Sequence, residues 1–94
     1  MAVTIKLIGA LRHVAGAGEF TVDCKGNVSI RELVDDFTRK LPELKRSLID
    51  QQLDDPRPNV LILVNGREIG VLNGMDTTLP DGSEVVLIPV VHGG

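Results

Sequence analysis

The sequence predicts an α+β domain in which a sheet of four to five strands packs on one main helix. Three observations support this prediction: short stretches with apolar residues at alternate positions, one long apolar stripe at helical spacing, and clear turn signals between them. A chain of 94 residues is large enough for one small domain with a single core. We expect residues 1–91 to form that domain and residues 92–94 to form a flexible tail.

The first two strands are predicted from a period of two. Val3, Ile5 and Leu7 alternate with polar residues, so the odd-numbered side chains should face the core. Gly9 ends this strand, and a loop rich in small residues leads to a second alternating stretch, 19–23, whose even-numbered residues should point inward. The two stretches predict a hairpin with a long loop.

The main helix is predicted to begin at Ser29, because Ser29 and Glu32 have the spacing of a capping box. Its apolar residues form one continuous stripe at i, i+3, i+4, i+7 and i+11. They are Ile30, Leu33, Val34, Phe37 and Leu41. Pro42 breaks or restarts the helix, and Leu44, Leu48 and Ile49 suggest a further helical segment.

The second half of the chain is predicted to form a connector followed by three strands. The prolines of 54–58 predict a stiff, extended connector, since each proline fixes its own φ and biases the preceding residue away from helix. Val60–Val64 is wholly apolar, and Asn65-Gly66 is a strong hairpin signal leading into a short strand over 67–71. After a turn at 79–82, the last strand should span 84–91.

The strands at 60–64 and 85–91 are apolar at both parities, which one helix cannot explain. If the odd-numbered residues of the last strand face the helix, four apolar side chains lie on the opposite surface of the sheet. These are Leu61, Leu63, Val86 and Ile88. Either loops cover this second surface, or it is an exposed apolar patch of the kind that marks a partner surface.

The chain ends in His92-Gly93-Gly94. Average glycine usage of about 7% makes a terminal pair a chance event in roughly half a percent of chains. Glycines have no side chain and tolerate unusual backbone angles, which suits a tail that enters a narrow active site of another protein. Alternatively, the pair is an incidental flexible end or an expression remnant.

Composition argues against several function classes. The formal net charge is −3, and Trp and Tyr are absent, so nucleic-acid binding is not expected. The longest apolar run has too few residues for the ~20 that cross a bilayer, and no signal sequence opens the chain, so we expect a cytoplasmic protein without membrane association.

No metal site or bound cofactor is expected either. Cys24 is the only cysteine, and His13 and His92 lack partners at metal-ligand spacing. Cys24 reads as a small apolar residue at a strand end, or else as a thiol that accepts sulfur. No activated serine, Walker loop or dinucleotide fingerprint is present, so we do not expect an enzyme that acts alone.

The runs Val64–Glu68 and Leu79–Pro89, with the final Gly93-Gly94, resemble the MoaD/ThiS sulfur carriers, which have the β-grasp or ubiquitin-like fold with a mixed sheet. The opening Leu7–Arg12, with Ala15-Gly16 after it, resembles the first strand and loop of the small subunit of molybdopterin synthase. After Pro89 this chain has Val-Val-His before its glycines, an ending closer to the ubiquitin-related and archaeal small modifiers.

This resemblance implies that an ATP-dependent enzyme of the ubiquitin-activating type adenylates the terminal carboxylate and that sulfur then converts it into a thiocarboxylate. Gly94 would bear the sulfur, and Gly93 and His92 would enter the partner's site. Leu61, Leu63, Val86 and Ile88 would then dock on the activating enzyme or on a sulfur-accepting enzyme or large synthase subunit. The sequence leaves the recipient pathway open among molybdopterin, cysteine and thiamine synthesis and tRNA thiolation. Lysines of target proteins would be acceptors if the chain is also a modifier. The alternative function is a non-catalytic β-grasp interaction module.

Overall fold

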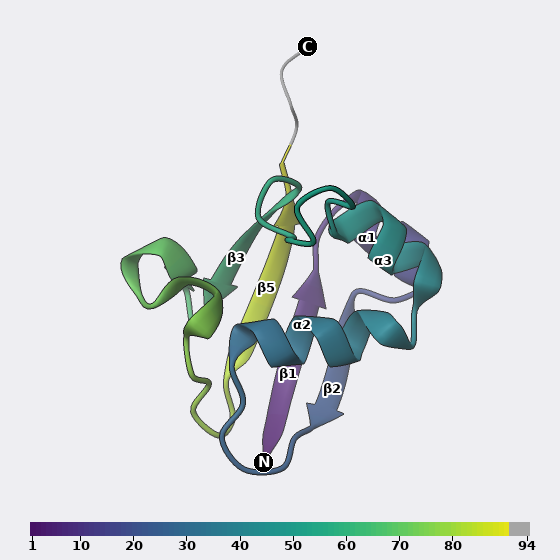
Figure 1. Cartoon of the computed structure of the whole chain (residues 1–94). Coiled ribbons are helices and arrows are strands. Elements are labelled where there is room, and N and C mark those ends of the chain that lie inside the picture. Colours follow the sequence, from purple (N-terminus) through teal and green to yellow (C-terminus); the bar gives the residue numbers. More distant parts are fainter. Residues whose placement is uncertain (91–94) are drawn as a thin grey trace.

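Five strands and three α-helices make up residues 1–90, the part of the chain that this computed structural model describes (Figure 1). Two short 3₁₀ turns, η1 and η2, follow the fourth strand. The elements in chain order are β1 (Ala2–Leu7), α1 (Ala10–Ala15), β2 (Glu19–Asp23), α2 (Ile30–Arg39), α3 (Pro42–Leu48), β3 (Val60–Val64), β4 (Arg67–Glu68), η1 (Ile69–Val71), η2 (Gly74–Asp76) and β5 (Glu84–Pro89).

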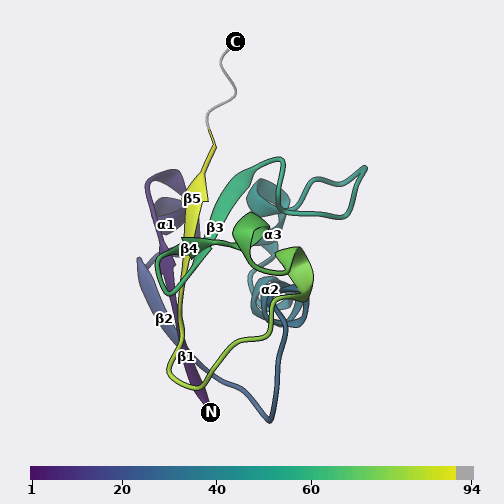
Figure 2. The same ribbon diagram turned by 90° about the vertical axis from the view of Figure 1, so that its left-hand side faces the viewer.

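The strands form one mixed sheet in the order β2-β1-β5-β3-β4. The central pair β1 and β5 is parallel, and the other neighbours are antiparallel. Helices α2 and α3 lie on the same side of this sheet (Figure 2). The predicted α+β fold with one mixed sheet is therefore confirmed.

The core lies between the sheet and these two helices. In β1 the odd-numbered residues are buried, as predicted, and in β3 and β5 one parity of each strand is buried as well. Helix α2 contributes Ile30, Leu33, Val34 and Phe37 to the core, which confirms the predicted stripe at these four positions. The further helical segment is also present: α3 begins at Pro42 and buries Leu44 and Leu48 completely.

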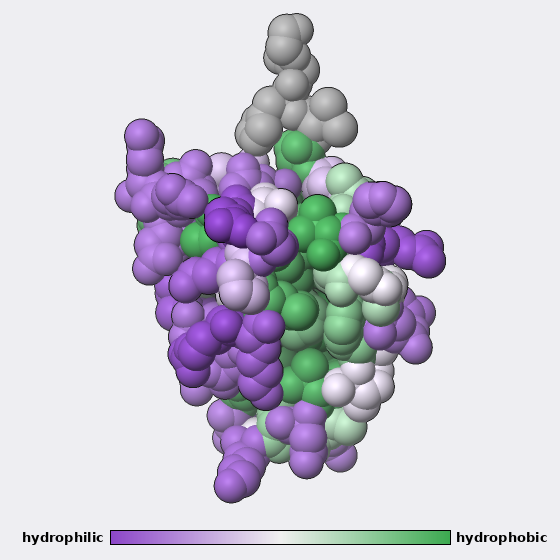
Figure 3. Space-filling model, turned by 90° about the vertical axis from the view of Figure 1, so that its right-hand side faces the viewer, coloured by the Kyte–Doolittle hydropathy of each residue, from purple (hydrophilic) through white to green (hydrophobic). Residues whose placement is uncertain are grey.

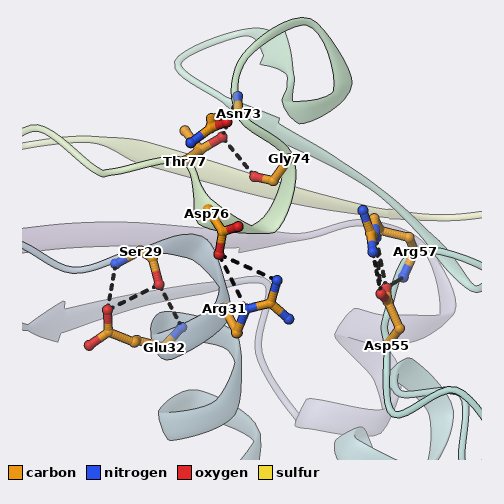
Figure 4. A network of polar contacts seen from close by, with 9 residues as sticks. All are labelled: Ser29, Arg31, Glu32, Asp55, Arg57, Asn73, Gly74, Asp76 and Thr77. Atoms are coloured by element: carbon orange, nitrogen blue, oxygen red, sulfur yellow. Dashed lines mark hydrogen bonds and ion pairs between the residues drawn. The ribbon is translucent and has the colours of Figure 1, made fainter.

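Ser29 caps α2 as the sequence predicts. Its hydroxyl oxygen accepts a hydrogen bond from the Glu32 backbone N–H at 3.1 Å, and the Glu32 carboxylate accepts one from the Ser29 backbone N–H at 3.3 Å (Figure 4). Two donors that the first turn would leave without partners are thereby satisfied. The helix ends at Arg39, so Leu41 is a partly buried residue between α2 and α3 and not part of the first helix.

Four further predictions about the elements are wrong. The link between β1 and β2 contains α1, which buries Leu11. The connector 54–58 is folded into a turn: the Asp50 N–H donates to the Asp55 carbonyl at 2.9 Å, and the Asp55 carboxylate binds Arg57 (Figure 4). The strand predicted over 67–71 stops at Glu68 and continues as η1, and the last strand stops at Pro89.

Candidate functional site

Two cross-strand pairs bring the four predicted surface residues together on the side of the sheet opposite the helices. Leu61 lies opposite Ile88, and Leu63 lies opposite Val86, in the antiparallel ladder of β3 and β5. Directly opposite residues in such a ladder point to the same face. We call these four residues the apolar face.

Burial supports this parity. Leu61 is 38% exposed and the other three residues are half-buried, whereas their chain neighbours Val60, Ile62 and Val85 are at most 2% exposed. The described residues thus leave the apolar face open to solvent. Of the two alternatives, the exposed patch fits the structure, and cover by loops does not.

Sequence reasoning missed Ile8, which extends the apolar face. Lys6 pairs with Val86 and Leu7 with Leu87, and the Ile8 N–H donates to the Leu87 carbonyl at 3.1 Å, which brings Ile8 alongside Ile88. Ile8 is 43% exposed. The even number of Ile8 could have indicated this position, since even-numbered residues of the first strand face away from the core.

Val90 is the second residue that the pattern missed. It follows β5 in the same parity as Val86 and Ile88, is 43% exposed, and its N–H donates to the Asn59 carbonyl at 2.9 Å. The apolar surface therefore continues along the chain beyond the end of β5. His92, Gly93 and Gly94, which the sequence analysis placed in the site, lie outside the described residues.

An ion pair borders the apolar face. The Lys6 ammonium lies 3.0 Å from the Glu84 carboxylate and 3.9 Å from that of Glu19. The hydrogen bond and the charge of Glu84 raise the pKa of Lys6 above its ordinary value. On the sheet surface opposite α2 and α3, the apolar side chains of β3 and of residues 86 and 88 in β5 therefore lie next to a charged group formed by Lys6, Glu19 and Glu84.

Residues 1–90 offer few chemical groups that could act on a substrate. No three His, Cys, Asp or Glu side chains within this range lie close enough to hold a metal ion, and none of its helices is long and apolar enough to cross a membrane. Cys24 is half-buried, and burial raises the pKa of its thiol. A raised thiol pKa leaves less of the nucleophilic thiolate at neutral pH.

Known proteins are similar to this chain in fold and in sequence. The model of the ThiS family matches residues 5–94. Small archaeal modifier protein 3 of Haloferax volcanii is 28% identical over 94 residues, which cover 100% of both chains. The solution structure of Urm1 from Trypanosoma brucei is 29% identical with a TM-score of 0.81, over 99% of this chain and 95% of that chain.

A third similar structure records such a protein together with another. The crystal structure of the Amycolatopsis orientalis BexX/CysO complex contains a chain that is 26% identical to this one, with a TM-score of 0.73 over 98% of this chain and 99% of that chain. The family model spans nearly the whole sequence, and the mixed sheet with its covering helices is the shared β-grasp architecture. The chain therefore belongs to the ThiS family, the MoaD/ThiS-like sulfur carriers of the ubiquitin-like β-grasp superfamily.

Proposed function

We propose that this chain carries sulfur on the carboxylate of Gly94. A partner enzyme of the ubiquitin-activating type would use ATP to adenylate that carboxylate: a carboxylate oxygen attacks the α-phosphorus and pyrophosphate leaves. The product is a mixed anhydride, in which AMP is a good leaving group. Sulfide (HS⁻) supplied by a partner then attacks the carbonyl carbon, AMP leaves, and the product is a thiocarboxylate.

The observation that carries this proposal is the apolar face on β3 and β5. It is an exposed apolar surface formed by two adjacent strands, and β5 is the strand that precedes Gly93 and Gly94 in the chain. Exposed apolar surface of this kind marks a site of protein association. A partner that docks there would hold the domain while residues 92–94 reach its active site, so in this proposal the chain is the substrate of its partner.

The match to the family supports the role of the last residues, because the ThiS model includes Gly94. Gly93 would keep the tail narrow, and His92 would lie at the entrance of the partner's site. The two partners would be the adenylating enzyme and then a sulfur-accepting enzyme or large synthase subunit. Since activation consumes ATP, we place the reaction in the cytoplasm.

A second role as a protein modifier is favoured by the similarity to Small archaeal modifier protein 3. The activated carboxylate that sulfur attacks is equally open to attack by a lysine amine, which would give an amide bond to a target protein. The two products differ in chemistry. A thiocarboxylate remains on the free carrier, whereas conjugation gives a heavier species that carries the target lysine.

The test is reconstitution with an adenylating enzyme of the ubiquitin-activating type, ATP and a sulfide donor. Intact mass spectrometry should show replacement of one oxygen by sulfur, with the change located in the last peptide, and pyrophosphate exchange should depend on the carrier. A chain that lacks Gly94 is the matched control. Equal activation of that shortened chain would overturn the proposal.

A further inference from the structure

A groove of about 800 Å³ runs between β2 and α2, at the edge of the sheet farthest from β4. The space-filling view of this side shows an apolar band with polar side chains along one flank and a paler surface with a few polar groups along the other (Figure 3). Half-buried side chains of β2, of Cys24 directly after it and of Leu41 between α2 and α3 line the groove, together with buried side chains of α2. The apolar lining residues are Phe20, Val22, Cys24, Leu33, Phe37 and Leu41.

The strand beside this groove has an open backbone edge. The Cys24 N–H donates to the Met1 carbonyl at 2.7 Å, and the Met1 amino group donates to the Cys24 carbonyl at 3.1 Å. Such hydrogen-bonded pairs alternate along an antiparallel ladder. Phe20 and Val22 therefore also bond to β1, while Glu19, Thr21 and Asp23 direct their N–H and C=O groups away from the sheet.

This row of backbone groups is a template for one more strand. An extended segment that pairs with residues 19, 21 and 23 would point every second side chain to the helix side of the sheet. Those side chains would enter the groove beside Val22 and Leu41. The opposite edge of the sheet offers fewer free backbone groups for an added strand, because β4 has only two residues.

The charges around the groove indicate what kind of segment fits. Each acidic lining residue is already bound within the chain: Asp23 lies 3.6 Å from the Met1 amino group, Glu32 belongs to the capping box, and Asp36 lies 3.4 Å from Arg39. Lys25 and Lys40 form no ion pair within residues 1–90. The groove therefore complements acidic residues in its occupant.

A second copy of the chain fits this edge poorly. The symmetric antiparallel pairing that uses all three outward residues places Thr21 opposite Thr21 and Glu19 opposite Asp23. Like charges directly opposite each other destabilise a sheet. A partner segment avoids this conflict when its acidic residues point to the groove side together with its apolar residues, because uncharged residues then lie opposite Glu19 and Asp23.

We propose that the β2 edge and the groove bind an extended peptide of another protein by strand addition, with apolar residues at alternate positions and acidic residues at its ends. This binding is separate from the proposed sulfur chemistry, since it uses neither the apolar face nor the last residues. A chain that lacks Gly94 should therefore bind the peptide as well as the full chain does. Loss of carrier activity and loss of peptide binding are thereby distinguishable.

The probe is the synthetic peptide Asp-Thr-Val-Thr-Ile-Thr-Val-Thr-Asp, whose acidic and apolar residues share one side, titrated into isotope-labelled protein and followed by NMR. We expect shifts of the Glu19, Thr21 and Asp23 amide signals, slower hydrogen exchange of these three groups, and shifts of the Val22 and Leu41 methyl groups. A peptide with serine at its three apolar positions should not bind. The absence of shifts along β2 at millimolar peptide overturns the proposal.

Variants of the protein test the geometry. Val22→Asp should weaken binding about tenfold or more, because a charge replaces an apolar contact. Thr21→Pro removes an outward N–H without loss of a bond to β1, and it should also weaken binding. Leu61→Asp, on the other side of the sheet, is the matched control and should bind normally. Unchanged binding by both β2 variants overturns the proposal, as does a stable dimer through β2 in sedimentation experiments.

Discussion

The rings of Phe20 and Phe37 meet edge to face, with centroids 5.1 Å apart and planes inclined at 67°. This contact joins the edge strand β2 to the middle of α2. Pairs of this geometry stabilise a protein by about 0.5–1.5 kcal/mol beyond the burial of their surface. These two residues are also the only aromatic residues of the types Phe, Trp and Tyr in the sequence.

Phe37→Ala should lower the free energy of unfolding by about 3–5 kcal/mol, since it removes a buried ring and leaves a cavity between helix and sheet. Urea denaturation followed by far-UV circular dichroism measures this change. The control is Val71→Ala, because Val71 is 69% exposed and should change stability by less than about 0.5 kcal/mol. Similar stabilities for Phe37→Ala and the parent chain would contradict the packing described here.

The Asp55–Arg57 contact predicts a pH dependence of stability. The hydrogen bond from the Arg57 side chain is the main cause that holds the pKa of Asp55 below its ordinary value of 3.8. Because the folded pKa is depressed, the stabilisation is complete above pH 3.8 and is lost as pH falls through the lowered pKa.

Asp55→Asn should therefore be less stable than the parent at neutral pH, by less than about 1 kcal/mol, because Arg57 is largely exposed. The difference in melting temperature between the two proteins should shrink as the solution becomes acidic. Asp54→Asn is a suitable control, as the Asp54 carboxylate forms no ion pair within residues 1–90. A constant difference from neutral to acidic pH would show that Asp55 acts through shape alone.

The sequence predicts those parts of the fold that depend on local patterns. The inward direction of Val3, Ile5 and Leu7 is encoded within one strand, and the Ser29 cap is encoded within one helical turn. The structure confirms both. The parity of β3 and β5 also follows from the pattern, since the odd and even residues of each apolar strand face opposite sides. The pattern thereby predicts that Leu61 and Ile88 share one surface, and their pairing in the sheet confirms it.

The missed features depend on contacts between distant parts of the chain or on side-chain bonding to the backbone. Helix α1 has six residues and no side-chain cap, so its sequence carries little helical signal and its stability comes from packing of Leu11. The connector 54–58 turns because the Asp50 and Asp55 carboxylates accept backbone N–H groups, which competes with the extended preference set by the prolines. Ile8 joins the apolar face only because β1 and β5 are parallel neighbours.

Deletion of Gly94 should abolish ATP-dependent activation and leave folding intact. Among the described residues, β5 ends at Pro89 and the buried core extends from Val3 to Leu87, so we expect stability to change by less than about 0.5 kcal/mol. Carrier-dependent pyrophosphate exchange measures activation, and thermal unfolding of the same preparation measures stability. Activation that survives the deletion would exclude the Gly94 carboxylate as the reactive group.

The apolar face provides the test of docking. Replacing Leu63 and Ile88 together by aspartate puts two charges on the half-exposed side of β3 and β5, while the buried residues of both strands are unchanged. The variant should still fold. Its binding to the adenylating enzyme should weaken by about 2 kcal/mol or more if these side chains lie at the centre of the interface, because an unpaired charge is costly to bury there.

Isothermal titration calorimetry with the adenylating enzyme measures this affinity, and Thr4→Asp is the control. Thr4 lies on the same side of the sheet as Leu63 and Ile88, because it precedes Lys6 by two residues on β1, but it lies outside the apolar face. Its substitution should leave the affinity unchanged within about 0.5 kcal/mol. If the double variant unfolds, the two side chains belong to the core; if it binds normally, the partner docks elsewhere.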